Sequence, residues 1–327
     1  MHRFALTLAL LFALALSTTT TAAIPAAACD EGTPDDHAAA LTTVLEEGVG
    51  GNHDLTLFDR TFAQGVLYHA TSTTDANDVE GVKAIFASAI DAFPDLTYTV
   101  EQQVADGQDV AVIYRAEGTN TNDFRGIPAT GKRVTWTGAM VATFSCGKAV
   151  EVWNASDRIG RDQQLGQWPI PTEQDPAEVL SAESLATIDD LPMLKCATPT
   201  PETIRDVIDA HLAAMTPASP LPEMETLFHP RVVHHRAVGS DLTGIPAAQA
   251  WLDAERGRFA DLAITHTEPI IRGDLAAIRW TAVGTTSNGR RAEWDGISVY
   301  WVACDRVREV WIEGDVVGML DQLGELP

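Results

Sequence analysis

The sequence of 327 residues contains two copies of one pattern, and this duplication constrains the fold more than any other feature. A shift of 166 residues aligns residues 93–96 (FPDL) with residues 259–262 (FADL), and His69 with His235. After an eight-residue deletion in the second copy the shift becomes 158, and the matches continue with Trp136 on Trp294, Cys146 on Cys304, Glu151 on Glu309, Trp153 on Trp311 and Asp157 on Asp315. Two long copies exclude a solenoid, which needs several short units. We therefore predict two similar domains of ordinary size.

The limits of the domains follow from this repeat. We expect a signal peptide at residues 1–28, a first domain at 29–167, a linker at 168–195 and a second, more divergent domain at 196–327. The linker is rich in proline and acidic residues and has room for a short helix.

The N-terminus has the pattern of a secretory signal peptide. Arg3 precedes an apolar run at residues 4–16, which is too short to span a bilayer, and a stretch of small residues follows. Cleavage after Ala28 fits an A-x-A site, and cleavage after Ala23 is the alternative. The sequence therefore predicts a secreted or periplasmic protein.

The charge of the chain excludes several classes of partner. Asp and Glu number 46 against 22 Lys and Arg, which gives a net charge of −24. A surface this acidic repels nucleic-acid phosphates and anionic lipids. We expect no nucleic-acid partner and no membrane partner, unless Cys29 carries a lipid.

Four cysteines follow the repeat: Cys29 and Cys146 bracket the first copy, and Cys196 and Cys304 bracket the second. Of the three possible pairings, only Cys29–Cys146 with Cys196–Cys304 treats the two copies alike. The alternative is a lipoprotein with a lipid on Cys29, but Ala26 stands where such a motif usually has Leu. Lipidation would also leave Cys146 single, so we predict the two disulfide bonds.

Each copy begins with helical patterns and ends with strands. In the first copy, apolar spacing predicts helices at residues 37–49, 55–62 and 81–93 and a short strand at 66–69. Long strands are predicted at residues 96–105, 110–119, 133–145 and 149–154. This order predicts an α+β fold in which a curved antiparallel sheet carries the N-terminal helices on its concave face. Such a half-open cone encloses an apolar pocket.

Several short motifs of the first copy occur in a characteristic order: His69, residues 93–96, residues 106–107, residues 118–119, residues 126–132 (GIPATGK), residues 147–148, Glu151-x-Trp153, Asp157 and residues 164–166 (QLG). In this order the set resembles the SnoaL-like polyketide cyclase family, also called ester cyclases, of the NTF2-like superfamily. The resemblance covers nearly all of residues 37–167. The second copy looks like the same domain without the GIPATGK segment, and it has Ala260 in place of Pro94.

The resemblance implies an aldol-type cyclisation or isomerisation of a carbonyl compound without metal or cofactor. In such proteins an aspartate near the end of the last strand moves a proton, and the matching positions are Asp157 and, in the second copy, Asp315. A carboxylate in an apolar pocket has a raised pKa, which suits a base that acts next to a carbonyl. The candidate donor to the enolate is His69, or His235 in the second copy, and a backbone N–H is the alternative. The alternative for Asp157 is a helix cap.

Strand alternation places Glu151, Trp153 and Asp157 on one face, if the last strand continues beyond residue 154 to Asp157. The side chains that we expect around the pocket are Trp153, Trp136, Arg115, Glu151, Trp311 and Trp294. The alternatives are a core position for each tryptophan, and for Arg115 an ion pair with a nearby acid. The neighbours His234 and His235 face opposite sides of a strand and have no third ligand nearby, so no metal site is expected.

Two classes of function remain. The first is an exported cyclase- or isomerase-like enzyme that acts on a small carbonyl or polyketide-ester-like compound. The second is a non-catalytic module that kept the pocket and binds a small apolar or carbonyl-containing ligand, because a fold does not determine a function. In both cases the two domains are candidates for an intramolecular pseudo-dimer, since related single-domain proteins commonly dimerise through the sheet.

Overall fold

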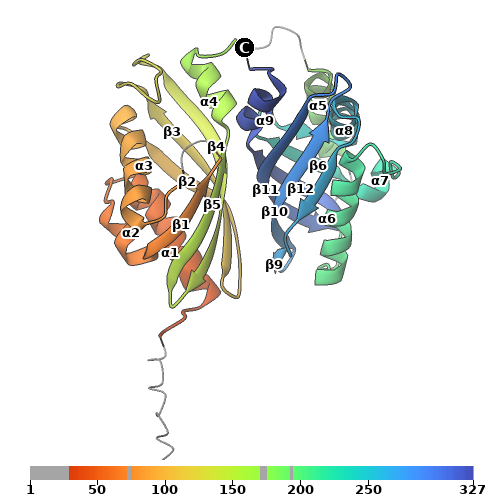
Figure 1. The fold of residues 1–327 in the computed structure, drawn as a ribbon. Coiled ribbons are helices and arrows are strands. Elements are labelled where there is room, and N and C mark those ends of the chain that lie inside the picture. Colours follow the sequence, from red (N-terminus) through yellow and green to blue (C-terminus); the bar gives the residue numbers. More distant parts are fainter. Residues whose placement is uncertain (1–28, 72–74, 170–174, 192–193, 327) are drawn as a thin grey trace, which may run out of the picture.

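The computed structural model describes residues 29–71, 75–169, 175–191 and 194–326, and the expected signal peptide at residues 1–28 lies outside these ranges. The described chain forms two sheets, each with helices on one face (Figure 1). In the described ranges no helix has both the length and the apolar character that a membrane crossing requires.

The first domain places most of its helices before its long strands. The helices are α1 (Pro34–Thr43), which continues into the π-helix η1 (Val44–Val49), α2 (Thr56–Thr61) and α3 (Val79–Ala92). The strands are β1 (Phe62–Ala70), β2 (Thr97–Asp106), β3 (Asp109–Thr119), β4 (Arg133–Ser145) and β5 (Lys148–Ser156), in the spatial order β1-β5-β4-β3-β2. Helix α4 (Arg158–Leu165) follows the last strand.

Local sequence explains where these helices begin and end. The Thr33 hydroxyl accepts a hydrogen bond from the Asp36 N–H, and the Asp36 carboxylate accepts one from the Thr33 N–H, which together form a capping box ahead of Pro34. The Asp78 carboxylate caps α3 by accepting a hydrogen bond from the Gly81 N–H, and α3 ends before Phe93 because Pro94 restricts the residue that precedes it.

The second domain repeats this order with additional short strands. Its strands are β6 (Phe228–Arg236), β7 (Leu242–Thr243), β8 (Ala263–His266), β9 (Ile270–Arg272), β10 (Leu275–Thr285), β11 (Arg291–Ala303) and β12 (Arg306–Gly314). They lie in the order β7-β6-β12-β11-β10-β8, and β9 pairs with β10. Its helices are α6 (Pro201–Met215), α7 (Met224–Leu227), α8 (Ile245–Arg258) and α9 (Val316–Leu323).

The predicted duplication is confirmed by the register of the two sheets. Strand β3 lies between β4 and β2, and β10 lies between β11 and β8. Ala116 pairs with Trp136 in the first sheet, and the equivalent Ala282 pairs with Trp294 in the second. The structure thus contains two tandem α+β domains.

Each sheet is mixed, whereas we expected an antiparallel one. Strand β1 runs parallel to β5, and β6 runs parallel to β12. These pairs set His69 opposite Trp153 and His235 opposite Trp311. Alternation of apolar residues predicts a strand but not its direction, and a parallel partner requires a long crossover, which α3 and the meander β2–β4 provide in the first domain.

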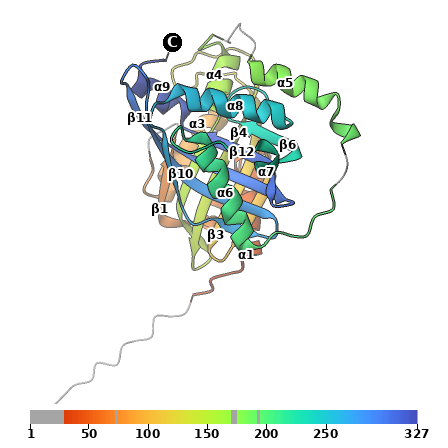
Figure 2. The same cartoon turned by 90° about the vertical axis from the view of Figure 1, so that its right-hand side faces the viewer.

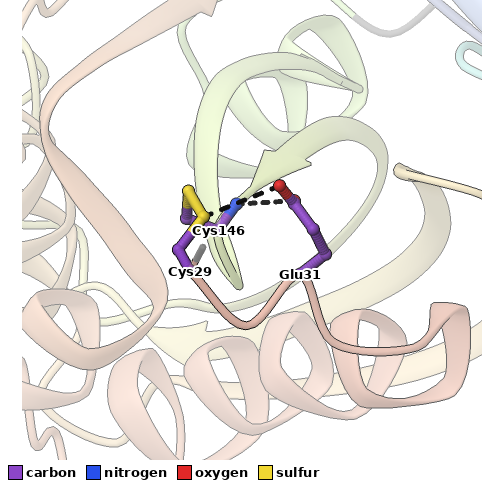
Figure 3. A group of neighbouring side chains, drawn as sticks. All are labelled: Cys29, Glu31 and Cys146. Atoms are coloured by element: carbon purple, nitrogen blue, oxygen red, sulfur yellow. Dashed lines mark hydrogen bonds between the residues drawn. A yellow bond between two sulfur atoms is a disulfide. The ribbon is translucent and has the colours of Figure 1, made fainter. Parts of the chain in front are cut away.

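Each domain contains one disulfide bond, and the pairing is the one that the repeat predicts. Cys29 bonds to Cys146 in the β4–β5 turn, and Cys196 bonds to Cys304 in the β11–β12 turn. Glu31 lies beside the first bond, and its carboxylate accepts a hydrogen bond from the Cys146 N–H at 2.8 Å (Figure 3). Each bond therefore ties the start of its domain to the tip of the last hairpin.

Helices α1–α3 of the first domain and α6–α8 of the second lie on the outside, and the other faces of the two sheets face each other (Figure 1). Helices α4 and α9 lie beside each other at one end, between the domains (Figure 1). Seen along the stacking direction, α6, α7 and α8 lie in front of the second sheet, with the first domain behind it (Figure 2). Each domain has its own core between sheet and helices. A third hydrophobic cluster joins the two sheets and contains Val104, Ala111, Ile113, Ala139, Val141, Ala155, Ala277, Ile297, Val299 and Trp311.

The expected linker contains helix α5 (Pro176–Leu185) and the short 3-10 helix η2 (Ile188–Asp190). Helix α5 packs on the second domain, where Ala177 forms a small cluster with Leu242 of β7 and Ala247 of α8. Arg236 of β6 pairs with Asp175 and Glu178 at 2.8 and 3.0 Å. This part of the chain therefore covers the edge of the second sheet.

His211 and His234 are fully buried next to each other inside the second domain. His211 of α6 lies with Nδ1 3.1 Å from the Tyr300 hydroxyl, and its ring centroid is 5.4 Å from that of His234. Burial lowers the pKa of His211 to about 4 and holds the pKa of His234 well below its usual value. The first domain has Leu45 and Tyr68 at the equivalent positions.

We expect these histidines to destabilise the fold as the pH falls from about 6.5 to about 4. The unfolded chain binds protons on both residues below about pH 6.5, whereas the folded residues stay neutral, which costs up to about 1.4 kcal/mol per residue and pH unit. Urea unfolding at pH 6.5 and 4.5 tests this with the double variant His211→Leu, His234→Tyr as the comparison. The parent should lose about 2–5 kcal/mol more of its unfolding free energy than the variant. Equal losses in the two proteins would contradict this expectation.

Candidate functional site

A cavity of about 740 Å³ lies between the two domains. Its walls come from β1 and β5 of the first domain and from β8, β10 and β11 of the second. The side chains that matter below are His69, Trp153, Arg279, Trp294, Asp295 and Asp315. Its volume is in the range of small-molecule sites.

The concave side of the first sheet, where we expected the pocket, is filled by large side chains. Tyr68, Tyr98 and Tyr114 are buried there with Trp136 and Phe93. The Tyr114 hydroxyl donates to Asn154 Oδ1 at 2.8 Å, and Trp136 packs on Phe93 with the ring centroids 5.5 Å apart. The open space therefore lies on the opposite face of this sheet.

His69 stands near the end of β1 and lines the cavity. Its Nε2 lies 3.0 Å from Glu151 Oε1, and its Nδ1 lies 3.5 Å from Asp75 Oδ2. The imidazole stacks on Trp153 with the ring centroids 5.2 Å apart. The parallel pairing of β1 with β5 produces this stack, because it sets the two residues side by side. The ring is thus oriented by two carboxylates and one indole.

The second domain builds the same group around His235. Its Nδ1 lies 2.9 Å from Asp241, its Nε2 lies 3.6 Å from Glu309, and its ring stacks on Trp311 at 4.7 Å. Burial alone would lower the pKa of His235, but the hydrogen bonds and charges of Asp241 and Glu309 outweigh it and raise the pKa to about 9. His235 is therefore a cation at neutral pH.

The two predicted aspartates cap the helices that follow the last strands. Asp157 Oδ1 accepts a hydrogen bond from the Gly160 N–H at 2.7 Å, and Asp315 Oδ1 accepts one from the Gly318 N–H at 2.9 Å. Burial raises the pKa of Asp157 to about 6 against the opposing effect of this bond, and burial also raises the pKa of Asp315. Of the two, Asp315 lines the cavity and Asp157 does not.

The remaining predicted residues lie in three different places. Glu151, Trp153 and Trp294 lie at or beside the cavity. Trp136 is in the core of the first domain, and Trp311 is buried in the cluster between the sheets. Arg115 forms an ion pair with Glu101, with Nε 2.6 Å from Oε1, which is the alternative that we considered for it.

The region around His235 that corresponds to the cavity is filled. Glu313 occupies the position that Ala155 has in the first domain, and its side chain is only 4% exposed. Burial raises the pKa of Glu313 to about 8, with the charge of Asp157 acting in the same direction. Trp311 packs in one cluster with Ile113, whereas the equivalent Trp153 faces Arg279. These replacements explain why the cavity lies beside His69 and not beside His235.

Arg279 and Glu313 are not among the residues predicted for the site. The repeat itself carried the signal, because both are charged residues where the other copy has the apolar Ile113 and Ala155. A charge in an otherwise apolar strand position needs a reason, either a partner or a ligand.

One group of His, Cys, Asp and Glu side chains in the described ranges is close enough to share a metal ion. It consists of Cys29, Glu31 and Cys146 (Figure 3). The two sulfur atoms form a disulfide bond and cannot act as thiolate ligands. This group is therefore part of the covalent frame.

Comparison with known families gives a match in each domain. Residues 39–165 match the SnoaL-like polyketide cyclase family, and residues 208–310 match the SnoaL-like domain. Comparison with curated proteins found no match.

Several solved structures match this chain over the length of one domain. A candidate SnoaL-like polyketide cyclase from Jannaschia sp. CCS1 is 20% identical, with a TM-score of 0.40, and the match covers 43% of this chain and 98% of that one. IdmH, a candidate polyketide cyclase from Streptomyces antibioticus, is 28% identical, with a TM-score of 0.36 and coverage of 41% and 99%. AclR, a candidate hydroxylase from Streptomyces galilaeus, is 24% identical, with a TM-score of 0.38 and coverage of 42% and 100%.

The two family matches fall on the two copies of the repeat, one in each sheet-and-helix unit. Residues 39–165 therefore belong to the SnoaL-like polyketide cyclase family, and the chain is a tandem pair of SnoaL-like domains.

Proposed function

We propose that this protein binds a small carbonyl compound in the cavity between its domains and moves a proton there, in a reaction of the cyclase or isomerase type. The observation that carries this proposal is that Asp315 of the second domain and His69 of the first line the same cavity. These are two of the residue types that the family resemblance names, and here they come from different copies. The two domains then work as an intramolecular pseudo-dimer.

The roles follow from the surroundings of each group. Asp315 is the base that removes a proton next to the carbonyl, because burial raises its pKa toward the working range of such a base. His69 is held by Glu151 through Nε2. Because a carboxylate only accepts, Nε2 carries the proton in this contact, and Nδ1 carries a second N–H only in the imidazolium form of the ring. Nδ1 is 3.5 Å from Asp75, which is long for a hydrogen bond, so in that form its N–H can donate to a ligand oxygen.

The location of the protein is part of the proposal. The chain is exported, cleaved after Ala28 and active as a secreted or periplasmic protein. The two disulfide bonds support this, because such bonds persist in oxidising compartments.

A non-catalytic binding protein is the second candidate. It is supported by the hydrogen bonds that already occupy Asp315 Oδ1 and His69 Nε2, since a site with satisfied groups can bind without reacting.

An isotope-exchange experiment separates the two candidates. The protein is incubated in D₂O with levulinate, 4-oxo-4-phenylbutanoate and their methyl esters, and NMR follows deuterium uptake next to the ketone. Calorimetry with the same compounds measures binding. Protein-dependent exchange supports the enzyme, and binding without exchange supports the binding module. Absence of both binding and exchange would contradict the proposed site.

A further inference from the structure

Arg279 is a cation in the middle of β10, at the wall of the cavity. Its guanidinium carbon lies 3.4 Å from the centroid of the Trp153 ring, which belongs to the other domain. The equivalent residue of the first domain is Ile113, which belongs with Trp311 to the cluster between the sheets. Arg279 is therefore a feature of this side of the interface alone.

The stacked guanidinium has no hydrogen bond or ion pair with the residues that the structure describes. The acids that act on its charge are Glu151, Asp295 and Asp109. Each of these accepts a hydrogen bond from another group: Glu151 from His69, Asp295 from the Thr281 hydroxyl and Asp109 from the Thr143 hydroxyl. The stack on Trp153 uses one face of the guanidinium and leaves its N–H groups, which lie in the plane, available.

Arg115 of the first domain shows what such a side chain does when an acceptor is within reach. It lies in β3 and donates from Nε to Glu101 at 2.6 Å. Arg279 is about half buried and lacks this neutralising contact. An arginine in this state favours a planar anion, because the guanidinium fork matches the two oxygens of a carboxylate.

We propose that Arg279 binds a carboxylate of the ligand, so that the ligand class of the cavity is a small keto acid. The inference rests on the proposed function for the ketone and adds the carboxylate. Aromatic walls from Trp153 and Trp294 border the space next to the guanidinium. The acidic side chains Asp75, Glu293 and Asp295 repel the ligand's carboxylate from the rest of the cavity, which orients the keto group toward His69 and Asp315.

Calorimetry with matched acids and esters tests the proposal. Levulinate and 4-oxo-4-phenylbutanoate are compared with their methyl esters, which keep the ketone and remove the charge. For at least one pair we expect the acid to bind about 10- to 100-fold more tightly, the usual worth of a hydrogen bond to a charged group. Arg279→Gln should abolish this preference, and Arg205→Gln, which removes a surface arginine paired with Glu268, should leave it unchanged.

Three outcomes would overturn the proposal: equal binding of acid and ester, an unchanged preference in Arg279→Gln, and no binding of any of the four compounds. The deuterium-exchange experiment distinguishes a failure of this proposal from a failure of the proposed function. If the esters exchange deuterium as fast as the acids, the proton-transfer function is supported and the proposed role of Arg279 is contradicted. If the acids bind through Arg279 without deuterium exchange, the carboxylate site is supported and the proposed enzymatic function is contradicted.

Discussion

Replacing Asp315 by Asn is expected to lower the rate of deuterium exchange by about 10²–10⁴, whereas the same change at Asp157 leaves the rate within a few-fold. A positioned group that transfers a proton contributes about this much to a rate. Both aspartates cap a helix of eight residues, and Asn is as good a cap as Asp, so both variants keep the fold. The difference between them is that Asp315 lines the cavity.

The two variants control for each other. Any loss that comes from weakening a helix cap appears in both, and a loss that comes from chemistry appears in Asp315→Asn alone. NMR exchange rates and the urea midpoints of the three proteins are the measurements. A large loss in Asp157→Asn with a parent-like Asp315→Asn would move the site to the first domain and contradict the cross-domain arrangement.

Loss of either disulfide bond is expected to destabilise its domain by about 4–5 kcal/mol. The bonds join residues 117 and 108 positions apart in the chain, and closing such long loops removes much entropy from the unfolded state. The variants are Cys29→Ser with Cys146→Ser, and Cys196→Ser with Cys304→Ser. Guanidinium unfolding, followed by fluorescence and circular dichroism, measures the change.

Domain-specific probes make this result sharper. His211 and His234 report on the second domain by NMR, and His37 and His53 report on the first. Each double variant should shift the unfolding of its own histidines more than that of the others. Variants that unfold at the parent's midpoint would show that the bonds contribute no stability.

Most of the fold could be predicted from the sequence because the pattern of an element in one copy is supported by the same pattern in the other copy. The predicted strand at 133–145 coincides with β4, and its second copy coincides with β11 at the expected offset. The predicted helix at 81–93 corresponds to α3, which ends where Pro94 requires. The direction of β1 relative to its neighbour could not be predicted, since it depends on which strand β1 pairs with in the folded sheet.

The position of the site was harder to predict. Alternation along β5 placed Glu151 and Trp153 on one face, and the structure keeps them together with His69. The alternation does not determine whether that face of β5 lines the concave side of the sheet or packs toward the other domain. One signal was present: residues 110–114 of β3 are apolar without alternation, and all five are buried. Such a run is typical of a strand that is covered on both faces.

A structure of the protein soaked with 4-oxo-4-phenylbutanoate would show where the ligand binds and which side chains hold it. We expect ligand density between β5 and β10, with the carboxylate at Arg279 and the ketone near His69 and Asp315. Density inside the first domain, among Tyr68, Tyr98 and Tyr114, would contradict it, and so would a cavity that stays free of ligand at saturating concentration.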